Sequence, residues 1–499
     1  MKKKISMFQW SMVNGQWSMV LICLLFFCSC SKREYLNVIP QNPAFVVSVD
    51  FKTISEKGEI SESPYLPQLT SLLGGMSEKF SDYVENPSKI GIDFRQPAYL
   101  FGDGSYIGLT MAVYDEDDLA DFFTVLHQQN ACGPLTEKDG IHYTKIQGVK
   151  GIVVFDKHTL LYINSSAEYA CQLLAQQEEN SFTATDAYDR MTNLEGEILM
   201  YGNAASVPST AVSDMKSLLP EGVRYTDVDA YSSTRFADGS IIVSTQLRGK
   251  TKEAQRLIED GSETLEKIKG DYIQSAPEDF LLWACVGVEK GGLLNILKNS
   301  KAGHQLLLVL ERAIDIEQIL RQVEGDAVIM MPRSYKAYGY EQFMFISKVD
   351  NTDFMKDVDY WQKSMADFDM SMSRTIGDNF VLKAGIKTFN WGLEGDQFYF
   401  ATDDMFAHNA TAQRSNLLKP LEKDICSSYL YAYINLQTLL EGTNMTPARC
   451  AFPMPPFLWM LKSVIFQSKE HGTLDIAINL KDESQNSLKT LFHATDTTY

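Results

Sequence analysis

The sequence predicts an α+β fold made of two tandem related units, each an antiparallel or mixed sheet with helices packed on one face. Three observations lead to this prediction. The 499-residue chain repeats an ordered series of apolar blocks, tight turns join short strand-like runs, and segments with helical spacing lie between them. A hydrophobic content of 45% and a charged content of 22% are those of an ordinary globular protein.

The repeat is seen as pairs of similar blocks at a nearly constant offset. The Pro-led run Pro43–Asp50 returns as Pro277–Val286, and the strand-like run Ile241–Leu247 returns as Leu474–Leu480. Four further pairs keep the same order: Ala98–Phe101 with Ala327–Met330, Leu109–Asp115 with Phe343–Asp350, Leu160–Asn164 with Gln397–Ala401, and Ile198–Asn203 with Tyr429–Ile434. Ordered matches of this kind predict a tandem duplication.

The turns indicate how strands pair within each copy. Short turns at Gly102–Gly104, Ala237–Gly239 and Glu394–Asp396 join consecutive apolar runs. Hairpins with such turns favour antiparallel pairing. We expect the first α+β repeat to span residues 41–272 and the second to span 273–499.

The N-terminus has the features of a lipoprotein signal peptide. Lys2–Lys4 supply the positive region, and Met19–Phe27 form an apolar stretch too short to cross a bilayer as a mature helix. The small residue before Cys30 and the polar residues after it resemble the box at which bacterial lipoproteins are cleaved and acylated. The interpretation is therefore a signal peptide at 1–29, lipidation of Cys30 and a tether at 30–40.

Two alternatives to this N-terminus stay open. Cys28 is a competing acceptor, although Phe27 before it is a poorer cleavage neighbour. The segment could also be an uncleaved anchor or an ordinary secretory signal. Acylation with several chains would hold the protein durably at a lipid leaflet. We expect an outer-membrane location, with the periplasmic or surface face undecided.

Five cysteines remain after this segment, namely Cys132, Cys171, Cys285, Cys426 and Cys450. The number is odd, so at least one is free unless it pairs between chains. Cys285 lies in an apolar run and is expected to be buried, while a disulfide between Cys426 and Cys450 is an open alternative. No CxxC pair occurs, which excludes a zinc site of that type.

The formal net charge of −19 argues against nucleic-acid partners. A body this acidic repels phosphates at long range, and the sequence has no Lys/Arg-rich run that would form a basic patch. A neutral or cationic partner remains allowed.

The densest acidic cluster, Asp115–Asp118, allows two interpretations. Several carboxylates could bind calcium. The favoured interpretation is helix initiation, with Asp115 as the N-cap and acids in the first turn. The second copy repeats the spacing at Asp350 and Asp353 with less charge, so capping explains both copies and calcium explains one.

Motifs for other chemistry are absent from the sequence. The seven histidines show no local metal-binding spacing and no HExxH motif. No GxSxG elbow is present, and Gly102–Gly108 does not have the spacing of a phosphate-binding loop. We therefore predict no cofactor, no metal and no catalytic residue.

The most unusual apolar segment is Ala451–Leu461. If exposed, Phe452, Phe457 and Trp459 would form a partner-binding surface. If buried, a helix opened by Pro455 or Pro456 would pack Phe457, Met460, Leu461 and Val464 at helical spacing, and this is the favoured alternative. The segment is nevertheless the one candidate partner surface that the sequence offers.

Several motifs together resemble a known family. The Cys30 box, the run Ile39–Asp50 and the segment Lys89–Phe94 before an apolar strand are similar to those of two-copy lipoproteins of the Bacteroidota. These are uncharacterised proteins of roughly 500 residues, classed as a domain of unknown function. The resemblance implies an envelope location and brings no activity or site residues.

The functional prediction combines these points. We expect a non-enzymatic cell-envelope lipoprotein that acts through a protein or ligand interface. The alternative is a glycan-directed hydrolase or a glycan-binding lipoprotein of the outer membrane. Glycan binding would need exposed aromatic platforms such as Trp283 or Trp391, and both lie in strand-like runs typical of a core.

Overall fold

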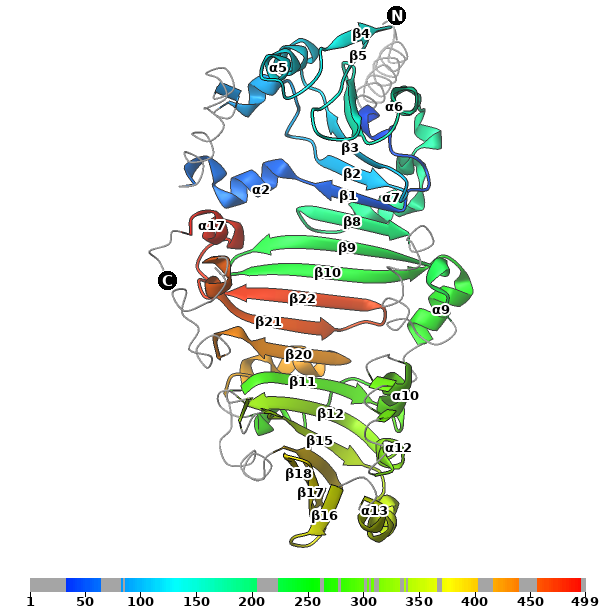
Figure 1. The fold of residues 1–499 in the computed structure, drawn as a ribbon, viewed down its shortest axis with the longest axis vertical. Coiled ribbons are helices and arrows are strands. Elements are labelled where there is room, and N and C mark those ends of the chain that lie inside the picture. The colour runs from blue at the N-terminus through cyan, green and yellow to red at the C-terminus, as the bar shows by residue number, and fades with distance from the viewer. Residues whose placement is uncertain are drawn as a thin grey trace, which may run out of the picture. The chain divides into compact units, whose positions relative to one another are not determined.

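A computed structural model gives the structure of the chain (Figure 1). The structure describes residues 33–63, 82–83, 86–203, 223–260, 264–276, 280–299, 303–304, 307–308, 314–332, 336–337, 340–365, 370–402, 416–438 and 456–494. Within these ranges no helix has both the length and the apolar character of a bilayer-crossing segment. The predicted signal peptide and Cys30 lie outside the described residues.

The chain divides into two compact units. Unit 1 comprises residues 1–52 and 67–193, and unit 2 comprises 53–66 and 194–499. The short segment 53–66 therefore belongs to the same unit as the C-terminal part of the chain. Each unit is described by itself.

Unit 1 contains an antiparallel ladder in the order β1-β2-β3-β7-β6-β5-β4. Its strands are β1 (Phe45–Val49), β2 (Ala98–Gly102), β3 (Ile107–Ala112), β4 (Thr136–Lys138), β5 (Ile141–Thr144), β6 (Ile152–Phe155) and β7 (Thr159–Ile163). Its helices are η1 (Glu34–Leu36), η3 (Pro87–Ile90), α5 (Glu116–Gln128), α6 (Ala167–Leu174), η4 (Glu178–Asn180), η5 (Phe182–Ala184) and α7 (Asp186–Thr192). The predicted turn at Gly102–Gly104 lies between β2 and β3, as a hairpin requires.

The acidic cluster of unit 1 begins helix α5. The side chain of Asp115 accepts hydrogen bonds from the backbone N–H groups of Asp117 and Asp118, each at 3.0 Å. This geometry is that of an N-cap, so the predicted capping role of Asp115 is confirmed. Phe123 of α5 stacks on Phe155 of β6 with ring centroids 5.6 Å apart, which joins the helix to the sheet.

Unit 2 contains a longer antiparallel sheet in the order β8-β9-β10-β22-β21-β20-β11-β12-β15-β19-β18-β17-β16. The first seven of these strands are β8 (Ile198–Asn203), β9 (Val228–Ala237), β10 (Ser240–Gly249), β22 (Thr473–Leu480), β21 (Leu461–Ser468), β20 (Leu430–Asn435) and β11 (Phe280–Val288). The others are β12 (Val323–Pro332), β15 (Met344–Val349), β19 (Gln397–Ala401), β18 (Lys387–Glu394), β17 (Asn379–Ala384) and β16 (Met370–Arg374), and β13 (Lys336–Ala337) and β14 (Tyr340–Glu341) form a separate hairpin.

The helices of unit 2 are short. They are α2 (Phe51–Gly58), which begins in unit 1, η2 (Ile60–Glu62), η7 (Tyr225–Asp227), α9 (Lys252–Asp260), η8 (Ile273–Ser275), α10 (Gly292–Asn299), α12 (Ile316–Leu320), η9 (Asp353–Asp357), α13 (Val358–Ser364), η11 (Lys419–Leu421), α15 (Glu422–Cys426), η12 (Pro456–Met460) and α17 (Ser487–Phe492). Figure 1 shows α9 beside one end of β10 and α17 near the end of β9.

Two cores lie on opposite faces of the β11–β19 part of this sheet. One gathers Trp391 and Phe398 with side chains of α10, α12 and α13. The other gathers Trp283 and Tyr431 with side chains of η8 and α15. Trp283 and Trp391 are both fully buried, which confirms their predicted place in the core and leaves neither as a glycan platform.

The predicted fold class, two tandem α+β units with helices on one face of each sheet, is wrong. The described strands lie mostly in large antiparallel ladders, seven strands in unit 1 and thirteen in unit 2. Strand β10 pairs with β22 from Ser240 opposite Asn479 to Gln246 opposite Thr473, so one sheet holds strands from both predicted copies. The strand order β1-β2-β3-β7-β6-β5-β4 nevertheless has the same form as β11-β12-β15-β19-β18-β17-β16.

A second expectation is also wrong. Asp350 was expected to cap a helix as Asp115 does. In the structure the next helix, η9, begins after Thr352, and the Asp350 carboxylate instead forms an ion pair with Lys290. This ion pair, together with the Asn351 and Thr352 that replace the acids of the first copy, removes the charge pattern that favours a cap.

Candidate binding face in unit 2

Six neighbouring strands of unit 2 present an apolar surface on one side. Side chains opposite each other in an antiparallel pair point to the same face, so the pairing register shows which residues lie together. Two rows follow from the registers of β9, β10, β22, β21, β20 and β11. The rows are Phe236, Ile241, Ile478, Val464, Ile434 and Leu282, and Thr234, Val243, Ile476, Phe466, Ala432 and Ala284. We call these twelve side chains the apolar face.

The apolar face is accessible along its whole width. None of its twelve residues is buried, and all are partly exposed. Four neighbouring hydrophobic residues on the same side are more exposed still. They are Met200 at 43%, Leu430 at 37%, Leu474 at 38% and Ile329 at 38%. A side of a sheet that packs against a second layer would be buried, so among the described residues no such layer covers this side and a ligand or partner could contact it.

The opposite side of the same strands differs in character. Next to Val243 and Ile476, the polar residues Ser244 and Asp475 lie opposite each other on that side. Further along, on β20 and β11, the same side carries the buried Tyr431 and Trp283. This side also has a partly exposed apolar row, Ile242, Ala477 and Ile465, so the apolar face is distinguished by its two continuous rows of almost entirely apolar side chains.

No charged side chain belongs to the apolar face. In the adjoining row, the hydroxyls of Ser232 and Thr245 lie 3.1 Å apart and form a hydrogen bond with each other. Ligands that need ion pairs or many hydrogen bonds would find few partners here. The surface thus favours contact with apolar groups.

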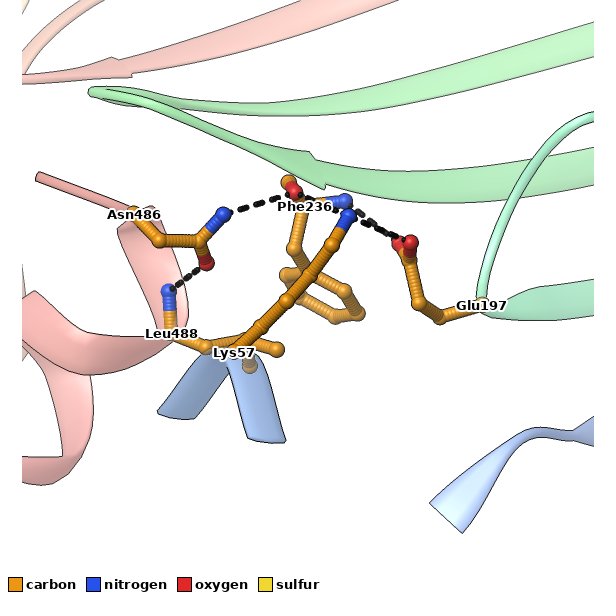
Figure 2. A network of polar contacts seen from close by, with 5 residues as sticks. All are labelled: Lys57, Glu197, Phe236, Asn486 and Leu488. Atoms are coloured by element: carbon orange, nitrogen blue, oxygen red, sulfur yellow. Dashed lines mark hydrogen bonds and ion pairs between the residues drawn. The ribbon is translucent and has the colours of Figure 1, made fainter. Parts of the chain in front are cut away.

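A polar network fixes the end of β9 beside the apolar face (Figure 2). The Lys57 ammonium of α2 donates to Glu197 Oε1 at 2.6 Å and to the Phe236 carbonyl at 2.9 Å. Glu197 Oε2 accepts the Phe236 N–H at 2.8 Å. Asn486 donates from Nδ2 to the Phe236 carbonyl at 3.0 Å and accepts the Leu488 N–H at 3.1 Å, which caps α17.

This network joins three distant parts of the sequence. The Glu197 side chain is only 8% exposed, so its charge depends on Lys57 and on the Phe236 N–H for compensation. The segment 53–63 and helix α17 are thereby held at the end of β9. Their role at the apolar face is structural support.

Asp326 is the most buried carboxylate of unit 2 among the described residues, at 1% exposed. It accepts backbone N–H groups of Lys269 and Gly270 at 2.7 Å and of Asp271 at 2.9 Å. Burial raises the pKa of Asp326 above its usual range, and the three N–H bonds oppose that shift. With its oxygens engaged by the backbone, this carboxylate holds the turn at 269–271 in place.

Comparison with protein-family models assigns the chain to a family. The model of an uncharacterised family, the domain of unknown function DUF4836, matches residues 35–488. The match covers nearly the whole chain, including all six strands of the apolar face. The chain belongs to the DUF4836 family.

Other comparisons add little to this DUF4836 assignment. No curated protein matches the chain. Three crystal forms of TP0453 show weak similarity, with 14%, 13% and 12% sequence identity, and cover 46%, 47% and 43% of this chain and 86%, 89% and 79% of their own. The TM-score is 0.25 in each case, a value that does not establish a common fold.

Most of the site residues predicted for this DUF4836 chain lie outside the described residues. This holds for the lipidation site Cys30 and for Phe452, and for the side chain of Phe457, whose backbone lies in η12. Trp459 is 9% exposed and therefore buried. The structure thus does not bring these three aromatic residues together in a described surface.

The cysteine predictions are partly answered. Cys132, Cys171, Cys285 and Cys426 are free thiols, and Cys285 is buried as expected. Because Cys426 is a free thiol, the open alternative of a disulfide between Cys426 and Cys450 is not found, and Cys450 itself lies outside the described residues. In the part of the chain that the structure describes, no three His, Cys, Asp or Glu side chains gather as metal ligands.

Sequence reasoning identified the strands of the apolar face but not the face itself. Ile241–Leu247 and Leu474–Leu480 were both recognised as strands. The missing information was the pairing of β10 with β22, which joins residues 227 to 239 positions apart. Local patterns do not specify such a partner.

Proposed function

We propose that the chain is a non-enzymatic binding protein of the cell envelope, tethered by acylation of Cys30, and that it binds through the apolar face of unit 2. One observation carries the proposal, namely the partly exposed, uncharged surface across six paired strands. Contiguous apolar surfaces of this extent usually mark interaction sites, because exposing them to water is costly.

The envelope location has separate support. The apolar stretch before Cys30 and the family resemblance to lipoproteins of the Bacteroidota both favour export and acylation. The proposal includes an outer-membrane location. Such an anchor would bring the apolar face close to a lipid leaflet.

The binding role is tested by introducing a charge on each side of one strand. Val243→Asp places a carboxylate on the apolar face, and Ser244→Asp places one on the opposite, polar side of β10. The full-length proteins are titrated with Nile red, a neutral apolar dye, at one fixed detergent concentration. We expect Val243→Asp to lower dye binding by about half or more and Ser244→Asp to leave it unchanged. Equal binding by both variants would refute a binding role for the face.

The anchor is tested by intact-mass analysis of the mature protein purified from membranes. The expected mass begins at Cys30 and includes acyl chains. A mature chain that begins elsewhere, or carries no acyl mass, would remove the proposed envelope anchor and leave the apolar face to be judged by dye binding alone.

A further inference from the structure

The geometry points to a ligand class for the apolar face. We propose that it lies against the acyl chains of an electrically neutral phospholipid leaflet. The inference rests on the proposed binding function and deepens it, because it names what the face contacts. Four properties support it: the uncharged side chains of the face, the pairing of its strands on both sides, the width of the face, and the net charge of the chain.

The side chains of the face suit hydrocarbon. Eleven of the twelve are Ile, Val, Leu, Phe or Ala, and Thr234 is the one polar member. Contact with acyl chains would bury no charge, and the neighbouring Ser232 and Thr245 hydroxyls already satisfy each other. A protein partner would ordinarily require about one hydrogen bond per 100–200 Å² of interface, which these side chains scarcely provide.

The backbone hydrogen bonds of the face are also compatible with contact with hydrocarbon. Strand β10 pairs with β9 and β22, and β22 pairs with β10 and β21. Strands paired on both sides have their N–H and C=O groups engaged in the sheet, so contact with hydrocarbon leaves few of them unsatisfied. An open sheet edge would not have this property.

The width of the face indicates contact with many acyl chains rather than with a single one. Adjacent strands are about 4.8 Å apart, so six strands span about 24 Å. A single acyl chain would cover about one strand spacing. A surface of this width therefore fits several acyl chains side by side, as a leaflet presents them.

The net charge of the chain decides between the remaining occupants. At −19, two copies repel each other, which disfavours packing one apolar face on the same face of a second copy. The same charge disfavours anionic lipids and leaves neutral headgroups as the compatible surface. A neutral leaflet is the occupant consistent with all four properties.

The test is site-specific photocrosslinking in the full-length protein reconstituted into phosphatidylcholine vesicles. Benzoylphenylalanine is introduced in place of Val243 or Ile476 on the apolar face. The matched controls carry it in place of the adjacent Ser244 or Asp475 on the other side of the same strands. After irradiation, mass spectrometry of the modified peptides identifies what each position has captured.

We expect phosphatidylcholine adducts at positions 243 and 476 in about fivefold or greater excess over positions 244 and 475. Equal yields on the two sides would overturn the proposal. Crosslinks to a second copy would also overturn it, while leaving a binding role for the face intact. Equally abundant adducts from dissolved short-chain phosphatidylcholine, below its micellar concentration, would indicate a lipid carrier and refute the leaflet.

Circular dichroism of each substituted protein checks that it is folded. If one position on the apolar face does not fold, the other position decides the outcome, because the two lie opposite each other on neighbouring strands. Failure of dye binding by the unmodified chain would refute the proposed function. Dye binding without lipid adducts would refute only the lipid assignment.

Discussion

Asp326 shows how one side chain can hold a turn between distant strands. Its carboxylate accepts three backbone N–H groups from residues 269–271, more than fifty positions earlier in the chain. Because Asp326 is almost fully buried, water cannot replace these bonds when the side chain is removed. The interaction therefore contributes more than a comparable surface contact.

We predict that Asp326→Ala destabilises unit 2 by about 3 kcal/mol, since three hydrogen bonds are lost at a buried site. Urea unfolding measures the change, followed by tryptophan fluorescence, to which the buried Trp283, Trp361, Trp391 and Trp459 of unit 2 contribute. Asp482→Ala is the matched control, because Asp482 accepts hydrogen bonds from Ser484 and Gln485 at the surface. Equal losses from both substitutions would contradict the buried role of Asp326.

The raised pKa of Asp326 also predicts a pH dependence. A carboxyl whose folded pKa lies above its unfolded value of 3.8 binds protons more readily in the folded state. Lowering the pH through that window then stabilises the folded state relative to a variant that cannot titrate. We expect the stability difference between the natural chain and Asp326→Asn to grow in favour of the natural chain as the pH falls from 6 towards about 4. A difference that shrinks would show that the pKa is lowered instead.

Lys57 allows the loss of a buried ion pair to be compared with the loss of an exposed one. Removing its ammonium by Lys57→Met leaves the Glu197 carboxylate, 8% exposed, without its ion-pair partner. We expect a loss of about 3 kcal/mol in the free energy of unfolding. In the control Lys462→Met the partner Glu483 is 63% exposed, and about 0.5 kcal/mol or less is expected. Chemical denaturation of both variants checks the difference, and similar values for both would contradict it.

At the scale of elements, the sequence predicted strands and turns better than their arrangement. The hairpin turns at Gly102–Gly104, Ala237–Gly239 and Glu394–Asp396 are present, because glycine and aspartate determine tight turns locally. The helix cap at Asp115 is local in the same sense. Ile241–Leu247 was recognised as a strand, but the exposure of one side of this strand depends on which elements pack nearby, and no local pattern encodes that.

The turn between β9 and β10 tests how strictly such a hairpin is built. Gly239 has a positive φ of 62°, and a Cβ there would lie 2.6 Å from the Cα of Glu483. Gly395, between β18 and β19, has φ 68° but open space around it. We expect Gly395→Ala to cost about 1 kcal/mol from backbone strain alone. Gly239→Ala should cost about 3 kcal/mol because the steric clash with backbone is added.

Thermal unfolding of the two alanine variants measures this comparison. A Tm for Gly239→Ala equal to that of Gly395→Ala would show that the contact with Glu483 relaxes without cost. A result in the expected order would show that the β9–β10 turn is held tightly against residues 482–486 by packing.

At the scale of the whole molecule, the repeat in the sequence led to the wrong fold class. Two similar halves suggested two self-contained units, yet the sheet of unit 2 joins β10 of the first half to β22 of the second. β22 alternates apolar and polar residues and β10 has three apolar residues in a row near its start, and each could have ended a sheet at its own edge. Pairing them removes two exposed edges, which is favourable, but the sequence of neither strand alone predicts this pairing.

The β10–β22 pairing predicts a specific disulfide. Ser244 and Asp475 lie opposite each other on the same side, so a pair of cysteines at these positions should crosslink under mild oxidation. The control pair replaces Ser244 and Leu474, whose side chains point to opposite sides of the sheet. Tryptic digestion should link peptide 236–248 to peptide 470–481 in the first protein only. If this link is missing, or forms only between molecules at high protein concentration, the two halves do not share a sheet, and the apolar face would lose the two strands at its centre.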